Sequence, residues 1–430
     1  MSPAFLYDVC VAGAGPAGAT AAWYLARQGK RVLLLEKHRF PRDKVCGDAL
    51  CTRAQVHLER MGVLEAIVAA GEAAPVAIGG FVSPRGLSVL GNSERAAGPL
   101  VLTVKRLVLD ARLARAAAAA GAELVEESPV ESAELVDGAW TIRCDPGPAR
   151  PYRARVLIAA DGASSRLARS LGVVATAPDA VCSRAFVEAG TSDFASDGMA
   201  FFPPALLPGY CSLSREAGGE LNFCCYIIPG GRARPADLRR MHDSVLEGDP
   251  YVRAALGPRA KLGAMQAAPL RLAPVPRSYA DQFLVVGDAA GQIDALTGGI
   301  QYGMAAAEIA AEVLDHAFAS GDLRAGVLRR YHDRWMRSFG RDFKWSLAMA
   351  RALARHPIFL DAYAEVLRRR GPRSFAEWAE AMTGARSKRS FLHPRHVLPV
   401  LAEAFRQWWV RPTVETTTRA GDTPAVSRRA

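Results

Sequence analysis

A glycine-rich turn near the start of the chain is the first candidate for chemistry. Residues 13–18 read Gly-Ala-Gly-Pro-Ala-Gly. In this pattern the glycines permit a tight turn, a close approach of the backbone to a pyrophosphate, and close packing of the next helix on the preceding strand. Free amides at the start of that helix would bind the phosphates. The turn therefore predicts a dinucleotide site, with Gly13, Gly15, Pro16, Ala17 and Gly18 as binding residues.

An acidic residue stands where the ribose of such a dinucleotide would need one. Glu36 ends an apolar run 23 residues after Gly13, and a carboxylate there accepts hydrogen bonds from the adenosine ribose. Lys37 follows it and is included among the binding residues. The alternative is an ordinary glycine-rich loop in an α/β protein. The position of the turn between a predicted strand and a predicted helix favours the dinucleotide.

The elements around this turn are predicted from the hydrophobic pattern. Residues 7–12 (YDVCVA) and 31–35 (RVLLL) are short apolar runs typical of buried strands, and residues 19–29 carry apolar side chains at helical spacing. Together they predict a βαβ unit. Later segments repeat this character, with a helix predicted at 105–120, strands at 155–162 and 283–286, and a long helix at 299–320.

The pattern of apolar and polar residues changes in two other regions. Within residues 176–230, short β-rich runs such as SRAFVEAG and ELNFCCYII are interrupted by Gly and Pro, which indicates an antiparallel sheet. Beyond residue 321 the pattern is mostly helical and rich in arginine. Residues 413–430 have almost no large apolar side chains and predict a disordered tail.

The composition excludes several classes of protein. The chain has 430 residues, of which 50% are hydrophobic and 23% charged, so it is globular rather than disordered or fibrous. Eight cysteines without a C-x-x-C pair are too few for a disulfide scaffold, and no metal site is predicted. The start of the chain lacks the features of a signal peptide, and no apolar run reaches the ~18 residues of a membrane span. We expect a cytoplasmic protein.

The net charge of +11 is concentrated towards the C-terminal end. Residues 321–430 contain 22 Lys and Arg against 10 Asp and Glu, whereas the other 320 residues contain 32 against 33. A protein that binds nucleic acid would be basic more diffusely, so no nucleic-acid partner is predicted. Five of the seven tryptophans lie in the same basic region.

Several longer segments resemble a flavoprotein family. Residues 283–314 (FLVVGDAAGQIDALTGGIQYGMAAAEIAAEVL) resemble the second flavin-binding motif of the FAD-dependent hydroxylase and reductase superfamily, and residues 160–172 (ADGASSRLARSLG) resemble its Asp-Gly motif. Residues 40–63 (FPRDKVCGDALCTRAQVHLERMGV) resemble the Cys-containing flavin loop of geranylgeranyl-reductase-like flavoproteins, a branch of that superfamily. Residues 104–117 and 383–394 resemble the Arg-plus-helix segment and the helical extension of the same branch.

The resemblance implies a non-covalent FAD and assigns its contacts. Asp288 would accept a hydrogen bond from the ribityl chain, and the amides of residues 297–300 would face the flavin N1–C2=O edge, where a helix dipole stabilises negative charge. Arg106 would hold the ribose or ribityl side, its alternative being an i,i+4 pair with Asp110. Asp161 would act directly or by ordering its loop, its alternative being a simple turn residue. The other implied FAD contacts are Lys44, Cys46, Gly47, Gly162, Gly287, Gly298, Gly299 and Ile300.

Cys46 is the candidate catalytic residue. A buried cysteine is usually only a small hydrophobe, but the resemblance places this one beside the isoalloxazine, where the nearby Lys44 would lower its pKa. Substrate contacts are expected from Tyr210, Phe223 and Cys225. The stretch that holds them lacks the Trp and the Phe-Pro of the family's Tyr-x-Trp-x-Phe-Pro motif. That departure leaves the polyprenyl substrate open, but not the flavin.

The predicted fold class is α/β (α+β overall), a Rossmann-like FAD-binding domain with an inserted antiparallel-sheet substrate domain and a C-terminal helical extension. The expected domains are a discontinuous FAD-binding domain (1–75, 101–175 and 276–320), a substrate domain (76–100 and 176–275), a basic helical region (321–412) and a tail (413–430).

The resemblance implies an FAD-dependent oxidoreductase that acts on a sizeable apolar substrate, with hydride transfer from reduced flavin N5 to a carbon–carbon double bond. An NAD(P)H- and O2-dependent monooxygenase of an aromatic or polyketide-like substrate would use the same cofactor site. A third hypothesis is a lipid-binding escort-type module without flavin. The presence of Gly18, Glu36 and Asp288, which the flavin site requires, argues against it. NAD(P)H is expected to bind only transiently, because no second G-x-G-x-x-G occurs. Halogenation is disfavoured, since the halogenase Trp-x-Trp-x-Ile-Pro motif is missing from the sequence.

Residues 395–411 (RHVLPVLAEAFRQWWVR) predict an amphipathic helix with Val397, Leu401, Phe405 and Trp408 near one face. One interpretation is a terminal helix packed on the body, with its arginines in solvent. The other is a surface that docks on an anionic membrane or on an acidic carrier protein, because interfacial helices combine aromatic anchors with a cationic flank. The oligomeric state is left open.

Overall fold

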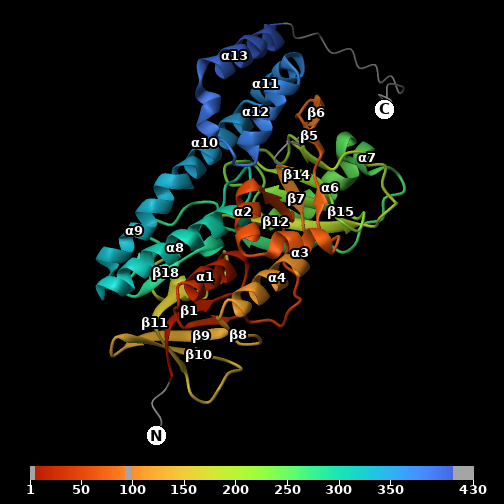
Figure 1. Ribbon diagram of the computed structural model, residues 1–430. Coiled ribbons are helices and arrows are strands. Elements are labelled where there is room, and N and C mark those ends of the chain that lie inside the picture. Colours follow the sequence, from red (N-terminus) through yellow and green to blue (C-terminus); the bar gives the residue numbers. More distant parts are fainter. Residues whose placement is uncertain (1–4, 93–97, 410–430) are drawn as a thin grey trace.

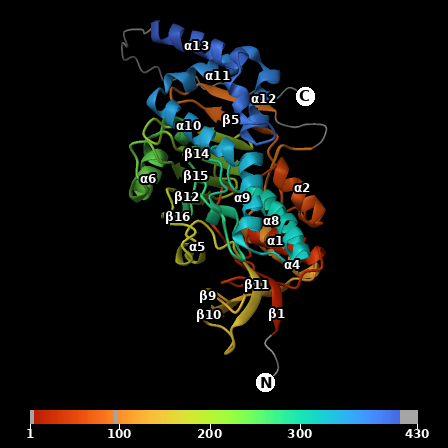
Figure 2. The same ribbon diagram turned by 90° about the vertical axis from the view of Figure 1, so that its left-hand side faces the viewer.

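The computed structural model describes residues 5–92 and 98–409. Figures 1 and 2 show the first sheet at one end of the molecule and the C-terminal helices at the other, with a second sheet beside them. The predicted fold class is confirmed: a Rossmann-like part, an antiparallel-sheet part and a helical extension are all present. The disordered tail expected at 413–430 lies outside the described residues.

The first sheet is built on the predicted βαβ unit. Its strands run in the order β17-β18-β11-β1-β2-β8, and β1 is parallel to both β2 and β11. The hairpin of β9 and β10 pairs with the start of β11. The bounds are β1 (Leu6–Ala12), β2 (Val32–Leu35), β8 (Glu123–Val125), β9 (Val130–Val136), β10 (Ala139–Cys144), β11 (Tyr152–Ala159), β17 (Tyr279–Ala280) and β18 (Phe283–Val285).

Alternate residues of these strands bury two different cores. Val9 and Val11 of β1 face a core formed with the helices, whereas Cys10 and Ala12 face a core on the opposite side of the sheet. A strand buried on both faces explains the continuous apolar runs of the sequence. The helices on the first side are α1 (Pro16–Arg27), α4 (Arg106–Ala119), α8 (Ile300–Ser320) and α9 (Ala325–Trp335).

The second sheet forms the predicted antiparallel part. Its order is β16-β12-β15-β14-β13-β5-β6, and within it only the β5–β13 pair is parallel. Helices α6 (Leu238–Gly248) and α7 (Pro250–Leu256) cover one of its faces. The strand bounds are β5 (Ile78–Val82), β6 (Ser88–Asn92), β12 (Ala180–Val187), β13 (Gly198–Phe201), β14 (Tyr210–Arg215), β15 (Leu221–Ile227) and β16 (Gln266–Leu270).

Short elements join the two sheets. A small sheet contains β3 (Ala49–Cys51), β7 (Val101–Thr103) and β4 (Ala74–Pro75) in that order. It packs with α2 (Thr52–Arg60) and α3 (Val63–Ala69) against α4 and α8. The remaining short helices are α5 (Arg166–Ser170), η1 (Pro235–Asp237) and η2 (Gly287–Ala290).

The C-terminal helices touch both sheets. Tyr331 and Trp335 of α9 are fully buried in the core beside the first sheet, and α11 and α12 pack against Phe81 and Val89 of the second. The basic region is therefore part of the folded body. Its remaining elements are η3 (Met336–Gly340), α10 (Arg341–Arg355), α11 (Ile358–Arg370), α12 (Pro372–Met382), η4 (Lys388–Leu392) and α13 (Pro394–Trp409).

Candidate functional site

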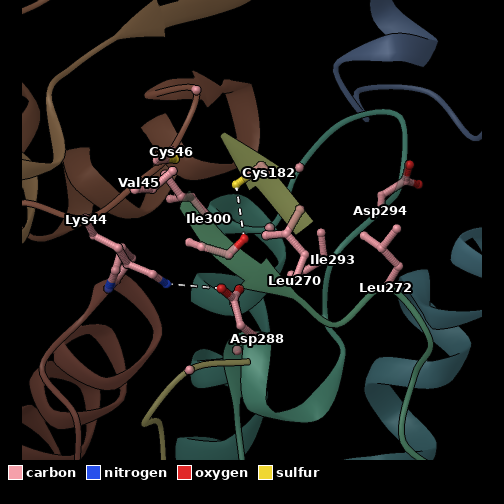
Figure 3. A pocket seen from close by; sticks show the side chains of 18 of the residues that line it. Lys44, Val45, Cys46, Cys182, Leu270, Leu272, Asp288, Ile293, Asp294 and Ile300 are labelled. Carbon is pink, nitrogen blue, oxygen red and sulfur yellow. Dashed lines mark hydrogen bonds and ion pairs between the residues drawn. The ribbon is translucent and has the colours of Figure 1, made fainter. Parts of the chain in front are cut away.

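A cavity is bounded by both sheets. It holds about 1160 Å³ of space not filled by atoms, part of it open to solvent. The carboxyl ends of β11 and β18 supply one side of it, as expected for a ligand site in a parallel sheet. In Figure 3, Lys44, Val45 and Cys46 face Leu270 and Ile293 across the cavity. The lining residues are Gly15, Pro16, Ala17, residues 44–49, Arg106, Ala160, Gly162, Cys182, Tyr210, Tyr226, Ile228, residues 268–270, Leu272, Gly287, Asp288, residues 293–295, residues 297–300 and Gly303.

The glycine-rich turn forms one end of the cavity. A Cβ at Gly18 would lie 1.9 Å from the Gly13 carbonyl oxygen, so the packing of α1 on β1 requires a glycine there. Gly15 differs, because a Cβ there would meet only the guanidinium groups of Arg106 and Arg42, each 3.9 Å away. The space above Gly15 is thus open and faced by two cations, which suits a pyrophosphate.

Four charged side chains form a buried network beside Gly15. Arg42 donates to Glu36 (3.1 Å) and to Asp110 (2.7 Å), and Arg106 donates twice to Asp110 at 2.7 Å. The i,i+4 pair of Arg106 with Asp110 is therefore present, and Arg106 also lines the cavity. Sequence reasoning missed Arg42, although it lies in the flavin-loop segment. Its Nε is buried without a hydrogen-bond partner among the described residues.

Two helix N-termini point at the same cavity. Gly15, Pro16 and Ala17 begin α1, and Gly299 and Ile300 begin α8. No described side chain caps either helix, so their first amides remain available to a ligand. The two helices pack closely, because a Cβ at Gly303 would lie 3.1 Å from the Ala17 Cβ. Figure 1 shows them side by side. The site therefore offers two positive helix ends to an anionic ligand.

Asp288 and Lys44 form an ion pair across the cavity. The Lys44 Nζ lies 3.1 Å from the Asp288 carboxylate, and the two side chains are 37% and 23% exposed. Figure 3 shows this contact as a dashed line. Asp288 follows β18 directly, in η2. Its remaining carboxylate oxygen is thereby held at the edge of the cavity, beside Gly287 and Gly299.

A lysine from the C-terminal region holds the loop before α8. The Lys388 Nζ lies 2.9 Å from the Asp294 carboxylate and 2.6 Å from the Thr297 hydroxyl. Ser346 of α10 also donates to Asp294, at 2.8 Å. Lys388 and Asp294 are both buried, and Asp294 lines the cavity. Sequence reasoning missed this pair, since the two residues are 94 positions apart.

Comparison with known proteins identifies the family to which the chain belongs. The chain matches the FAD binding domain family over residues 6–332. It is 31% identical over 383 residues to digeranylgeranylglycerophospholipid reductase 2 of Methanopyrus kandleri, covering 84% of this chain and 91% of that protein. The chain belongs to the geranylgeranyl-reductase-like family of FAD-dependent oxidoreductases.

Two further proteins are similar to this chain. The chain is 47% identical over 420 residues to conditioned medium factor receptor 1 of Dictyostelium discoideum, covering 94% of this chain and 82% of that protein. The fold matches a geranylgeranyl bacteriochlorophyll reductase-like protein of Thermoplasma acidophilum with a TM-score of 0.76 and 22% identity. That match covers 93% of this chain and 100% of the other, and at this identity it shows the fold alone.

The cavity fits an FAD. The open space at Gly15, the unpartnered Nε of Arg42 and the two helix N-termini suit the pyrophosphate and the flavin edge. Glu36 is buried at the end of β2 and accepts a hydrogen bond from the Ala14 amide at 3.1 Å. Among the residues predicted to contact FAD, those that line the cavity are Gly15, Pro16, Ala17, Lys44, Cys46, Gly47, Arg106, Gly162, Gly287, Asp288, Gly298, Gly299 and Ile300.

Five predicted FAD contacts, Gly13, Gly18, Glu36, Lys37 and Asp161, lie outside the cavity lining. Lys37 is exposed, outside the cavity lining, because it follows β2 at the surface. The Asp161 carboxylate accepts hydrogen bonds from the amides of Arg166 and Leu167 at 3.0 and 3.4 Å. It therefore orders the loop before α5, while its neighbour Gly162 lines the cavity. Of the two roles expected for Asp161, direct contact with FAD and ordering of its loop, this geometry fits the ordering of the loop.

Lys44 lowers the pKa of the Cys46 thiol, as expected, but other influences outweigh this effect. Burial raises the pKa of the Cys46 thiol above its usual range, and the opposing influence of Arg106 and Lys44 is weaker. The ammonium of Lys44 is instead paired with Asp288. The Cys46 carbonyl accepts hydrogen bonds from the side chains of Asn222 (3.0 Å) and Cys224 (3.5 Å). Cys46 is thus a neutral thiol on a loop that β15 holds in place.

Two predicted substrate contacts point away from the cavity. Phe223 and Cys225 are fully buried in the core between the second sheet and α6. Successive side chains of a strand point to opposite faces, so the cavity face of β15 carries the even-numbered residues, including Tyr226. Tyr210 lines the cavity as predicted and stacks on Tyr226, with ring centroids 4.7 Å apart. The wall also contains Cys182, which donates to the Ala268 carbonyl (Figure 3).

Proposed function

We propose that this FAD-dependent oxidoreductase saturates a carbon–carbon double bond in a long apolar lipid. The observation that carries the proposal is the cavity wall formed by the second sheet and the segment after it. Among the described residues this wall has no charged side chain, and its members are Cys182, Tyr210, Tyr226, Ile228, Ala268, Pro269, Leu270 and Leu272. Burial raises the pKa of Tyr210 and of Tyr226, so both hydroxyls stay neutral.

An apolar wall of this kind favours a substrate that lacks charge at the reacting carbon atoms. The relative from Methanopyrus kandleri is named as the reductase of a digeranylgeranylglycerophospholipid, a lipid with polyprenyl chains. Two aromatic rings and three aliphatic side chains give such a chain a surface to pack on. The missing Trp and Phe-Pro of the family motif alter the shape of this surface while leaving it apolar.

Saturation of a double bond adds one hydride and one proton. Bound FAD, reduced by NAD(P)H, supplies the hydride. The chain supplies the proton, and Cys46 is the candidate donor, because it lines the cavity and its raised pKa keeps the thiol protonated. The proton passes from Sγ to the second carbon atom, and solvent returns a proton to the thiolate. The wall residues exclude water and orient the alkyl chain.

The test uses the purified holoenzyme under anaerobic conditions. We expect NAD(P)H to bleach the flavin, and a polyprenyl lipid to reoxidise it with a product two hydrogen atoms heavier per double bond. The fully saturated lipid is the matched control and should leave the flavin reduced. Reoxidation only with O2, together with an oxygenated product, would establish the monooxygenase instead.

Cys46→Ser tests the proton donor. Loss of a general acid typically slows a reaction by about 10²-fold or more, and FAD retention should be unchanged because the loop is held through the Cys46 backbone. Cys182→Ser is the control, since Cys182 lines the same cavity but its thiol donates a hydrogen bond to the Ala268 carbonyl. Equal turnover of Cys46→Ser and wild type would remove Cys46 from the reaction.

A further inference from the structure

Helix α13 presents an apolar face to solvent. The side chains of Leu398, Leu401, Phe405, Trp408 and Trp409 are between 46% and 74% exposed. Their spacing of three to four residues places them on one side of the helix. Val397, which the sequence assigned to this face, is half-buried, and Leu398 takes its place. The Phe405 ring lies 6.1 Å from the rings of both Trp408 and Trp409, so the patch is a continuous aromatic cluster.

The inward face of the same helix combines small apolar residues (Val397, Val400 and Ala404) with a buried polar network around Glu403. Glu403 is only 4% exposed and binds Arg369 of α11 (3.0 Å), Arg406 (2.9 Å) and Gln407 (2.9 Å). Ala404, also buried, lies beside it. A surface helix of a water-soluble protein normally turns its apolar side inward. In α13 five large apolar residues point outward as well, and packing on the body does not explain these.

The surroundings of this face are positively charged. All of residues 358–409 are described, and in this segment the acidic side chains of Asp361, Glu365, Glu377, Glu380 and Glu403 are buried or half-buried. The exposed charged residues of the segment are arginines, namely Arg368, Arg369, Arg370, Arg373, Arg389, Arg395 and Arg406. Five of these arginines, Arg368, Arg369, Arg389, Arg395 and Arg406, are ion-paired with carboxylates, but arginines outnumber acidic groups in the segment. Solvent and any partner therefore meet aromatic rings on a helix whose neighbouring segments carry a surplus of guanidinium groups, called the arginine rim below.

We propose that α13 docks the enzyme on the surface of an anionic lipid bilayer, with the aromatic cluster at the boundary between headgroups and acyl chains. The proposal does not depend on the reaction catalysed. Amphipathic helices that lie in a membrane surface combine apolar anchors with basic flanks in this way. No described helix is long and apolar enough to cross a membrane, so the contact would be peripheral. Figures 1 and 2 show α13 at the outer end of the molecule, free of the sheets.

Lipid is favoured over a second copy of the chain by charge. Two copies that paired through α13 would bring their arginine rims together, and like charges at an interface oppose association. Anionic headgroups complement the rim instead, and each basic group near such a surface contributes about 1 kcal/mol of binding, roughly a fivefold change in affinity. An acidic protein would also complement the charge, and the experiment distinguishes it.

The test measures co-sedimentation of holoenzyme with vesicles. We expect binding to phosphatidylcholine vesicles that contain phosphatidylglycerol, and little binding to phosphatidylcholine alone. Binding should fall as added salt screens the headgroups. The double variant Phe405→Ser/Trp408→Ser should bind at least about tenfold more weakly, because it loses the two anchors. Trp345→Ser is the matched control, since Trp345 is an exposed tryptophan (47%) on α10.

Charge and the C-terminal residues are tested separately. Arg368→Gln with Arg373→Gln should weaken binding by roughly fivefold per charge, whereas Arg259→Gln, an exposed arginine of the second-sheet region, should not. A chain that ends at Trp409 should bind like the full chain. Phe405→Ser/Trp408→Ser and Arg368→Gln/Arg373→Gln should both keep bound FAD and the wild-type melting temperature, because the substituted side chains are exposed.

Four results would overturn the proposal. The first is equal recovery of wild type and Phe405→Ser/Trp408→Ser in the unbound fraction. The second is vesicle binding that does not depend on phosphatidylglycerol or on salt concentration. The third is loss of vesicle binding by the chain that ends at Trp409. The fourth is a self-associated state, or a complex with an acidic carrier protein, that depends on α13 while vesicles do not bind.

Discussion

The two ends of the cavity hold buried carboxyl groups in opposite ways. At the glycine-rich end, Glu36 and Asp110 are buried and each is paired with a guanidinium group. At the sheet end, Asp48 of the cavity lining and Glu216, which follows β14 outside the lining, are also buried, but the Asp48 Oδ1 and both Glu216 oxygens have no hydrogen-bond partner among the described residues. Burial raises the pKa of Asp48 to about 7 and that of Glu216 to about 8.

The contrast follows from what each end must bind. A pyrophosphate is negatively charged, so arginine side chains can remain charged in its binding site. Their charge is already neutralised in part by carboxylates. The sheet end is lined by apolar and neutral polar side chains, among which unpaired charge would be costly to bury. The raised pKa values of Asp48, Glu216 and Cys46 reflect that environment.

The largest effect is expected from Gly15→Val at the glycine-rich end. The fold has room for the side chain, because a Cβ at Gly15 meets nothing closer than 3.9 Å, but that room is the pyrophosphate site. FAD affinity should fall by more than about 10⁴-fold, over 5.5 kcal/mol. Equilibrium dialysis measures it, and an unchanged circular dichroism spectrum shows that the fold is intact. Gly326→Val, at an open position in α9, should keep its FAD.

Lys388→Met should have the next largest effect. It leaves Asp294 buried without its cation, which typically costs about 3–5 kcal/mol, and it releases the loop before α8. Urea unfolding should report the loss of stability, and Asp294→Asn in the same chain should restore much of it. Lys261→Met is the control, since that lysine is 70% exposed. If Lys388→Met is as stable as wild type, the loop is not held by this pair.

Asp288→Ala tests the boundary between the two ends. The variant loses a charge-assisted hydrogen bond to FAD, worth about 1.5–3 kcal/mol, and leaves Lys44 unpaired. FAD should dissociate about tenfold to a hundredfold more readily, which flavin fluorescence after dilution will show. Asp315→Ala removes an exposed carboxylate on the far part of α8 and should behave as wild type. Full FAD retention by Asp288→Ala after extended dialysis contradicts the assignment.

Glu216→Gln should leave FAD binding unchanged and alter only the pH dependence of stability. The folded-state pKa of about 8 lies above the ordinary value of 4.5, so between these pH values the folded chain keeps a proton that the unfolded chain has lost. The free energy of unfolding should therefore fall as pH rises through this window, by at most about 1.4 kcal/mol per pH unit from this group. Glu216→Gln should remove that slope. Glu188→Gln, an exposed carboxyl, should leave the slope unchanged.

The sequence by itself was sufficient for the glycine-rich turn and for the position of Asp288 after a buried strand, although not for Arg42. These features depend on short-range geometry: a turn that only glycine can make, a helix that begins at the turn, and a residue that follows a buried strand. The fold class followed as well, because strand and helix periodicities are local properties of the chain. The resemblance to flavoproteins rests on the same local motifs.

Only the tertiary structure decided the sheet end. The face of β15 that meets the cavity depends on strand register, and therefore Tyr226 lines it while Phe223 and Cys225 are in the core. The pKa of Cys46 depends on burial, which no neighbour in sequence reveals. Lys388 reaches Asp294 across 94 positions because the C-terminal helices fold back over the loop before α8. Burial and ion pairing arise from contacts between distant segments, so their outcome is set when the chain packs.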